Sequence, residues 1–464
     1  MVFSSLVFLW IFLPVVFIGS FLLPGKLKNV FLLAASLLFY TWGEPKYIVL
    51  MLISIFVNWI MGLLIDRYAS QKKIILILDI IFNLALLGYF KYFNFAMEII
   101  NTCIGKQIEA KEIALPIGIS FFTFQILSYI IDLYRGKYKA QKNIINLALY
   151  ISFFPQLIAG PIVRYEDINE QLETRKCTLE KTAEGVRRFI YGLAKKVIIA
   201  NSVAFTVDQI YALEPTQVTG MLAWVGAIFY TLQIYYDFSG YSDMAIGLGK
   251  MFGFEFLENF NYPYLSCSVQ EFWQRWHMSL GTWFREYVYI PLGGNRKGAA
   301  RTNINVLIVF FLTGLWHGAS FNFILWGIYY GVLQIIERFG FRKFLDKHRI
   351  FSHIYTILTF VFGWVVFRAE DLKQAGSMLI RMLMPWKYTE KVIAWQQVLN
   401  NRTVLIALLG ILGAGILQKL VSKKKWIVNL KNSYIELVYC VVLFFVCIMM
   451  LVSNTYNPFI YFRF

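Results

Sequence analysis

Long apolar runs, separated by short polar segments, make up most of the chain. Most of these runs are about 17 to 25 residues long, the length that an α-helix needs to cross the hydrocarbon core of a bilayer. They fall at residues 2–23, 29–43, 46–65, 74–93, 114–134, 144–160, 186–211, 219–237, 303–316, 319–337, 353–367, 403–420 and 434–453. The pattern predicts an all-α polytopic membrane protein, which we expect to form a single domain over residues 1–464.

Several of the runs are shorter than a full crossing. At 1.5 Å per residue, residues 303–316 extend about 21 Å, whereas the hydrocarbon core is about 30 Å thick. We therefore expect this helix to end inside the membrane or within a bundle of other helices. The next run begins at residue 319, so His317 is predicted to lie where the chain reverses direction.

The middle of the chain, residues 238–300, breaks the pattern of long apolar runs. It holds polar groups unsuited to lipid and several helix-disrupting residues: Gly240, Gly247, Gly249, Gly253, Pro263, Pro291, Gly293 and Gly294. Irregular backbone at membrane depth is tolerated only where protein or a water-filled cavity surrounds it. We predict re-entrant or in-plane helices that line a cavity. Within them, residues 268–287 are predicted to form an amphipathic helix with Glu271 and Arg275 paired four residues apart.

Composition supports a membrane protein. Hydrophobic residues make up 58% of the 464 residues and charged residues only 15%, against about 25% charged residues in soluble domains. Such a chain lacks the polar surface that a soluble protein of this size needs, so its outer solvent is predicted to be lipid. Aromatic residues, at 18%, are typical of the belts that membrane proteins place at headgroup depth.

The net charge of +17 comes from short basic clusters between the apolar runs. These clusters are Arg67, Lys72 and Lys73; Arg135, Lys137, Lys139 and Lys142; Arg296, Lys297 and Arg301; Arg338, Arg342, Lys343 and Lys347; and Lys423, Lys424 and Lys425. This spacing is typical of cytoplasmic loops under the positive-inside rule and argues against nucleic-acid binding. We expect an extracytoplasmic N-terminus on a retained first span, because the N-terminal residues have neither a basic start nor a cleavage site.

Two of the four histidines lie in or beside apolar segments, His277 in RWHMSL and His317 in LWHGAS. A histidine at membrane depth is costly unless it is hydrogen-bonded, and its near-neutral pKa suits it to proton transfer. Both are therefore candidate catalytic residues. The alternative is that they bond a backbone carbonyl and serve only helix packing. His348 and His353 are predicted to lie on the surface.

Other polar residues could bind a substrate. Asp237, in QIYYDFSG, could orient a histidine or hold a substrate, or could cap a helix that breaks at Ser239 and Gly240. Arg164 and Arg285 are candidates for an anionic group such as phosphate. The five cysteines show no C-x-x-C pair and no histidine at ligand spacing, so we predict neither a disulfide framework nor a metal site.

Taken alone, these residues describe a polytopic protein with a polar, glycine-rich cavity and two histidines. They match no phosphate-binding loop, dinucleotide fingerprint, G-x-S-x-G or HExxH pattern. Both an enzyme and a transporter would fit. Against a transporter, the chain shows no paired inverted halves with corresponding broken segments.

Five blocks of the chain resemble the membrane-bound O-acyltransferase (MBOAT) family, most closely its alginate O-acetylation branch. They are SFFPQLIAGPIVRYEDI, QIYYDFSGYSDMAIGLGKMFGFEFLENFNYPY, SVQEFWQRWHMSLGTWFREYVYIPLGGNRKG, FLTGLWHGASFNFILWGIYYG and the terminal NPFIYFRF. The resemblance runs from the first span to the last residue, and the two histidine blocks are its most specific part.

The resemblance implies a ring of transmembrane helices around in-plane helices, which together form a central funnel. Residues 301–337 would be the helices of the catalytic histidine, with His317 as general base or nucleophilic relay and His277 sharing the proton transfer. Trp276 and Trp316, beside the histidines, would line the substrate site with the residues already named.

It further implies an O-acyltransferase of the bacterial inner membrane that moves acetyl groups for O-acetylation of an exported polysaccharide. Acetyl-CoA is the expected donor substrate, and no bound cofactor is predicted. The expected partners are the lipid bilayer and an extracytoplasmic acetyltransferase. The alternative within the family is D-alanyl transfer to teichoic acids from an acyl carrier protein.

Overall fold

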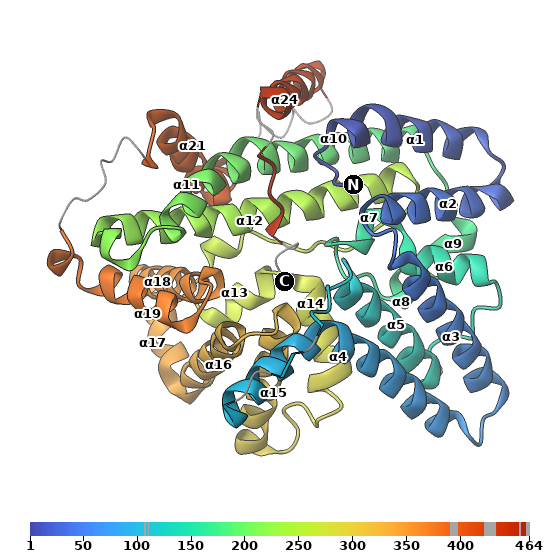
Figure 1. Ribbon diagram of the computed structural model, residues 1–464. Coiled ribbons are helices and arrows are strands. Elements are labelled where there is room, and N and C mark those ends of the chain that lie inside the picture. The colour runs from blue at the N-terminus through green and yellow to red at the C-terminus, as the bar shows by residue number, and fades with distance from the viewer. Residues whose placement is uncertain (106–107, 110, 390–397, 422–432, 454–455, 461–464) are drawn as a thin grey trace. The chain divides into compact units, whose positions relative to one another are not determined.

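The structure, a computed structural model, describes residues 1–105, 108–109, 111–389, 398–421, 433–453 and 456–460. Within these residues the secondary structure consists of α-helices, short π and 3-10 turns and no strands, which confirms the predicted all-α fold (Figure 1). The basic cluster Lys423 to Lys425 lies outside the described residues. The chain divides into two compact units, residues 1–189 with 242–257, and residues 190–241 with 258–464.

Seven helices in the described residues are long and apolar enough to cross a membrane. They cover Ile48–Arg67, Lys72–Ile104, Leu179–Tyr211, Gly298–His317, Arg349–Arg368, Asn401–Val421 and Tyr434–Ser453. Shorter apolar helices cover Phe8–Leu22, Leu27–Gly43 and Ile119–Tyr134. The multi-pass architecture expected from the apolar runs is therefore confirmed, while the ring and funnel remain predictions.

The first unit is built on apolar helices. Its elements are η1 (Phe8–Phe12), α1 (Leu13–Leu22), α2 (Gly25–Gly43), α3 (Ile48–Arg67), α4 (Lys72–Ile104), α5 (Ile119–Tyr134), α6 (Ile144–Ser152), α7 (Phe154–Leu157), α8 (Tyr165–Ile168), α9 (Gln171–Thr174) and most of α10 (Leu179–Ala194). Asn58 of α3 and Asn83 of α4 exchange two side-chain hydrogen bonds of 3.2 and 2.9 Å, so these buried amides satisfy each other. The pairing joins two spanning helices without water.

The second unit contains both candidate histidines. Its elements are η2 (Lys195–Ala200), α11 (Asn201–Tyr211), η3 (Pro215–Gln217), the first part of α12 (Gly220–Met251), η4 (Pro263–Leu265), α13 (Val269–Arg275), α14 (Met278–Phe284), η5 (Arg285–Tyr289), α15 (Gly298–His317), α16 (Phe321–Ile336), η6 (Glu337–Phe341), α17 (Arg342–Lys347), α18 (Arg349–Arg368), α19 (Leu372–Leu383), η7 (Pro385–Lys387), α21 (Asn401–Ile411), η8 (Leu412–Ile416), α22 (Leu417–Val421) and α24 (Tyr434–Ser453).

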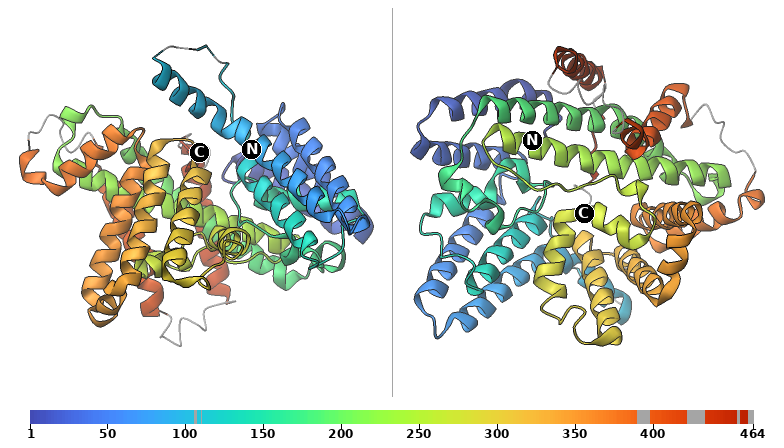
Figure 2. Two further views of the ribbon diagram at one scale, coloured as in Figure 1. Left: turned by 90° about the horizontal axis from the view of Figure 1, so that it is seen from below. Right: turned by 180° about the vertical axis from the view of Figure 1, so that it is seen from behind.

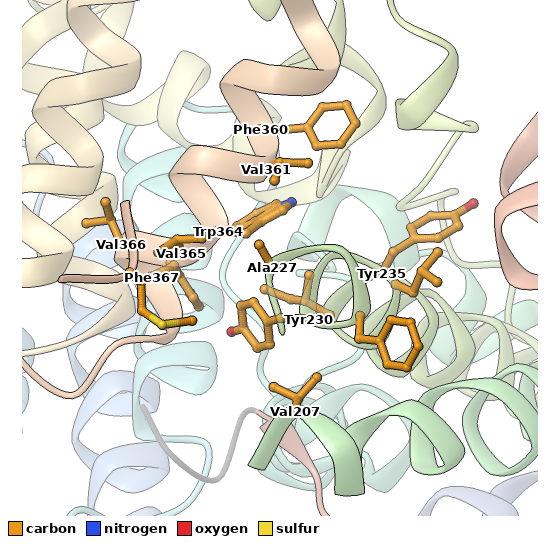
Figure 3. Close-up of a cluster of buried hydrophobic side chains, with 14 of the residues drawn as sticks. Val207, Ala227, Tyr230, Tyr235, Phe360, Val361, Trp364, Val365, Val366 and Phe367 are labelled. Carbon is orange, nitrogen blue, oxygen red and sulfur yellow. The ribbon is translucent and has the colours of Figure 1, made fainter. Parts of the chain in front are cut away.

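An aromatic and aliphatic core holds these helices together. Figure 3 shows Trp364 and Phe367 of α18 beside Ala227 and Tyr230 of α12, with Val207 of α11 beyond them. All five side chains are at most 3% exposed. This core fixes the end of α18 that bears Phe367, which matters for the site described below.

Helices α15 and α16 form a closely packed antiparallel hairpin (Figures 1 and 2). A Cβ atom at Gly314 would overlap the carbonyl oxygen of Phe323, and one at Gly327 would overlap the carbonyl oxygen of Phe310. Glycine at both positions therefore allows the backbones to approach, as small residues do between membrane helices. The hairpin confirms the predicted reversal, since α15 ends at His317 and α16 begins at Phe321.

Three expectations about the middle of the chain are wrong in detail. Helix α15 begins at Gly298, so it has 20 residues and a length of about 30 Å, enough for a crossing. Helix α12 continues unbroken through Ser239 and Gly240 to Met251, so the irregular backbone begins after residue 251 and not at 238. Residues 268–287 do not form one helix, because His277 separates α13 from α14.

Packing explains why α12 does not break. A Cβ at Gly240 would meet the carbonyl oxygen of Gly192 at 2.8 Å, so this glycine serves close helix approach and not helix termination. The predicted pair within α13 is confirmed, with Arg275 Nη2 2.9 Å from Glu271 Oε1.

Candidate active site

His317 lies at the end of α15 in an aromatic enclosure. Its imidazole is packed edge-on against Trp316, Trp326 of α16 and Phe367 of α18, with ring centroids 5.0, 5.1 and 5.1 Å away. The residue is only 5% exposed. A charge that forms on the His317 imidazole therefore lies in a region of low dielectric constant, where it interacts more strongly with neighbouring charges than it would in water.

His277 links α13 to α14 in an unusual backbone conformation. Its φ of 45° places it in the left-handed region, which a non-glycine residue adopts at a cost of order 1–3 kcal/mol. The residue is 2% exposed. Such strain concentrates at functional sites, and here it turns the imidazole toward Phe238, 4.6 Å away between centroids.

The hydrogen bonds around His277 define its tautomer. Asn259 Oδ1 accepts from the backbone N–H of Ser279 at 3.2 Å and from Ser279 Oγ at 2.9 Å, which identifies this atom as the amide oxygen. His277 Nδ1 lies 3.1 Å from the same oxygen. Because the oxygen can only accept, Nδ1 carries the proton, and the Nε2 lone pair is available as a base.

The other nitrogen of His277 is buried without a hydrogen-bond partner in the part of the chain that the structure describes. His277 lies between two short helices and outside the seven spanning helices. Burial lowers the pKa of its imidazole to about 3, so the ring is neutral at physiological pH. A buried, neutral imidazole whose Nε2 has no partner among the described residues can accept a hydrogen bond from a hydroxyl, but its low pKa makes it a weak base unless a bound substrate changes its surroundings.

The structure brings the two predicted histidines to one aromatic side chain. The Trp316 ring centroid lies 6.0 Å from that of His277 and 5.0 Å from that of His317. Trp276 does not share this position. It packs instead into the core, 4.8 Å from Trp364 and 5.1 Å from Phe260, and thereby holds the backbone beside His277.

Asp237 contacts neither histidine in any described hydrogen bond, and it does not cap a broken helix. It is 1% exposed, pairs with Lys196 Nζ at 2.5 Å and accepts the backbone N–H of Ile460 at 2.8 Å. Lys196 also contacts the carbonyl oxygen of Pro458. The ion pair therefore anchors the C-terminal segment to α12 and η2, one residue before Phe238, whose ring contacts His277.

The two predicted arginines lie in different environments. Arg164 belongs to the first unit, where its guanidinium pairs with Glu166 and, at 2.8 Å, with Asp167, closing a capping box on α8. Arg285, at the start of η5, has a side chain that is 70% exposed, 4.0 Å from Glu286. Neither is placed beside the histidines by a described contact, and their roles in substrate binding remain predictions.

Sequence reasoning missed three residues of the histidine cluster: Asn259, Trp326 and Phe367. Asn259 and Phe367 lie 18 and 50 residues from the histidines they contact, and Trp326 lies on the helix after His317, so no local pattern pointed to these contacts. Among the described residues, no group of three His, Cys, Asp or Glu side chains could hold a metal ion. The chemistry that this arrangement supports directly is proton transfer by imidazole in a buried, aromatic site.

The sequence of this all-helical membrane protein, with its two buried histidines, matches a known family. The model of the membrane-bound O-acyltransferase family, MBOAT, matches residues 139–374, and this range includes both histidines. The chain belongs to this family. It is a multi-pass O-acyltransferase of the bacterial inner membrane.

The relatives place the chain in the alginate O-acetylation branch. It is 42% identical to the "Probable alginate O-acetylase AlgI" of Pseudomonas putida, with all of both chains covered. It is 35% identical to the "Peptidoglycan O-acetyltransferase" of Helicobacter pylori, over 82% of this chain and 80% of the relative. The "Teichoic acid D-alanyltransferase" of Bacillus subtilis is 30% identical over 55% of this chain and 69% of the relative.

Proposed function

We propose that this protein takes an acetyl group from acetyl-CoA on the cytoplasmic side and passes it across the membrane for O-acetylation of a cell-surface polysaccharide. The observation that carries the proposal is the buried pair of imidazoles on Trp316, one of which has a defined tautomer and an available Nε2. The printed names of two relatives, a "Probable alginate O-acetylase AlgI" and a "Peptidoglycan O-acetyltransferase", support acetyl as the acyl group and a wall or exported polymer as the acceptor.

In the proposed reaction, an imidazole accepts the proton of a hydroxyl while the hydroxyl oxygen attacks the thioester carbonyl. The carbon–sulfur bond of the donor then breaks, and the departing thiolate takes up the proton. We assign the proton transfer to His317, with the neutral His277 as the second proton acceptor. The aromatic walls exclude water, which would otherwise compete with the hydroxyl for the acyl group.

D-alanyl transfer from a carrier protein is a weaker alternative, because the teichoic acid D-alanyltransferase matches only 55% of this chain. That branch is distinguished by its donor. A protein that uses acetyl-CoA directly does not need the carrier.

The test is thiol release from acetyl-CoA by the purified protein in liposomes, with carrier-bound D-alanine as a parallel donor. We expect turnover of acetyl-CoA that falls at least about 100-fold in His317→Ala, the usual contribution of a general base. His348→Ala is the matched control, because this histidine is exposed, stacks on Phe344 with centroids 4.3 Å apart and has Nδ1 3.0 Å from the backbone oxygen of the same residue. Turnover that survives in a folded His317→Ala variant, or that requires the carrier, would overturn the proposal.

A further inference from the structure

A thiol and an imidazole form a second pair in the same unit. Cys267 Sγ lies 3.4 Å from His353 Nε2 and 3.8 Å from His353 Nδ1. Cys267 precedes Ser268, the N-cap of α13, and His353 lies in the second turn of α18. Both residues are half-buried. His353, predicted to lie on the surface, is thus partly exposed and also contacts a thiol.

The backbone around the thiol is held on both sides. The backbone N–H of Cys267 donates to Glu271 Oε2 at 2.9 Å. The carboxylate of Glu337 accepts from the N–H groups of Val269 and Gln270 at 2.7 and 3.1 Å. These bonds fix the position of the Cys267 backbone relative to the helix that bears His353.

This pair is separate from the histidine site. Phe367, which packs on His317, lies fourteen residues after His353 along α18, a separation of about 21 Å at 1.5 Å per residue. The reaction proposed for His317 and His277 makes no use of it. When the imidazole turns the lone pair of a ring nitrogen toward the thiol, it can take the thiol proton, and the resulting thiolate is the nucleophilic form of cysteine.

Basic side chains follow in the adjoining segment. Arg342 Nη1 contacts Ser268 Oγ, one residue from the thiol, while its Nε pairs with Asp346 Oδ1 at 2.9 Å. Arg338, Lys343 and Lys347 are exposed on the same segment. This is the segment that the sequence predicts to lie in the cytoplasm. Guanidinium and ammonium groups favour phosphate, so the thiol is accompanied by charges suited to an anionic thioester of phosphopantetheine.

We propose that Cys267, with His353 as its base, is an acyl-accepting site for a phosphopantetheine thioester; this rests on the proposed function for the donor. His353 takes the proton of the thiol, and the thiolate attacks the thioester carbonyl. The bond between the acyl carbon and the donor sulfur breaks, a bond to Sγ forms, and the departing thiolate receives the proton from His353. One thioester replaces another without net oxidation or reduction.

The experiment measures acetyl transfer to the protein itself. The full-length protein in liposomes is mixed with acetyl-CoA, or in a second arm with an acetylated carrier protein, then acid-quenched and mapped by peptide mass spectrometry. We expect an acetyl group on Cys267 that neutral hydroxylamine removes, and an initial rate at least about 100-fold lower in His353→Gln. The arm that labels faster identifies the source of the phosphopantetheine.

Cys103→Ser is the matched control, because Cys103 is an exposed free thiol; labelling of Cys267 should be unchanged in it. Labelling of Cys267 no faster than that of Cys103, or equal rates in wild type and His353→Gln, would overturn the inference. The His317→Ala variant separates the two proposals. It should lose the turnover of acetyl-CoA, while its Cys267 should still become acetylated. Normal acetyl-CoA turnover without any Cys267 adduct would refute this inference and leave the proposed function standing.

Discussion

Asn259 decides which nitrogen of His277 can act as a base. Its amide oxygen accepts three hydrogen bonds in the buried interior. One comes from His277 Nδ1–H, and two come from the backbone N–H and the hydroxyl of Ser279. A side chain that orients a histidine in this way acts through the imidazole and does not touch the substrate itself.

Asn259→Ala should therefore lower kcat for acetyl transfer by about 10- to 100-fold, the usual loss when a histidine's orienting partner is removed. The KM for the donor should change little, because no donor contact is lost. Ser279→Ala removes one of the three donors to Asn259 but leaves the histidine bond, so it should retain most of the activity. Equal losses in both variants would indicate a general packing defect instead.

The burial of His277 should also appear in the pH dependence of stability. Its pKa in the folded protein, about 3, lies below the unfolded value of about 6.5. Below about pH 6.5 the unfolded state therefore binds one more proton than the folded state. The free energy of unfolding then falls by about 1.4 kcal/mol for each unit by which the pH is lowered. In His277→Gln this contribution is removed, so the free energy of unfolding measured in detergent should fall less between pH 6 and pH 5 than it does in the wild type. Identical slopes for wild type and variant would show that the ring is solvated.

At the scale of elements, the α15–α16 hairpin sets the position of His317. The two glycines allow the backbones to approach, and Trp326 of α16 then closes on the imidazole. The histidine is the last residue of its helix, so any displacement of the hairpin moves it directly.

Gly314→Ala should cost about 1–3 kcal/mol of stability, as overpacking does, because its Cβ would overlap the Phe323 carbonyl. Acetyl transfer should fall as well, since His317 would shift from Phe367. Gly376→Ala in α19 provides the comparison, because a Cβ there meets nothing within 4 Å. Thermal unfolding of both variants in detergent checks this; wild-type stability in Gly314→Ala would contradict the packing described.

At the scale of the whole molecule, the chain's C-terminal segment is tied back to the interior of the second unit. Asp237 and Lys196 are both almost fully buried and bind the backbone of Ile460 and Pro458. Phe459 stacks on Tyr241 with centroids 4.7 Å apart. A buried ion pair of this kind holds distant segments in one arrangement.

Lys196→Ala should lower the free energy of unfolding by about 3–5 kcal/mol, because it leaves the Asp237 carboxylate buried without its cation. Lys196→Met with Asp237→Leu should lose less than the single variant, since neither charge is then left unpaired. Denaturant titration of the single and double variants measures the difference. A double variant less stable than Lys196→Ala would show that the carboxylate is needed mainly for the bond to Ile460.

Hydrophobic patterning and composition were sufficient to predict a polytopic helical protein, because the preference of a segment for lipid is close to a sum over its own side chains. They also singled out His277 and His317, since an ionisable group among apolar neighbours is costly wherever the chain folds. Local sequence was a poor guide to helix ends: α15 starts five residues before its apolar run, and α12 continues through Gly240 because Gly192 packs against it.

The contacts that give the histidines their chemistry came only from the tertiary structure. Asn259 meets His277, Phe367 meets His317, and Cys267 meets His353, and each pair joins separate elements. Asp237 appeared from the sequence to be a cap or a substrate ligand, yet it binds the far end of the chain. Such pairings depend on how helices pack, which is a property of many side chains together, so no single segment of the sequence encodes them.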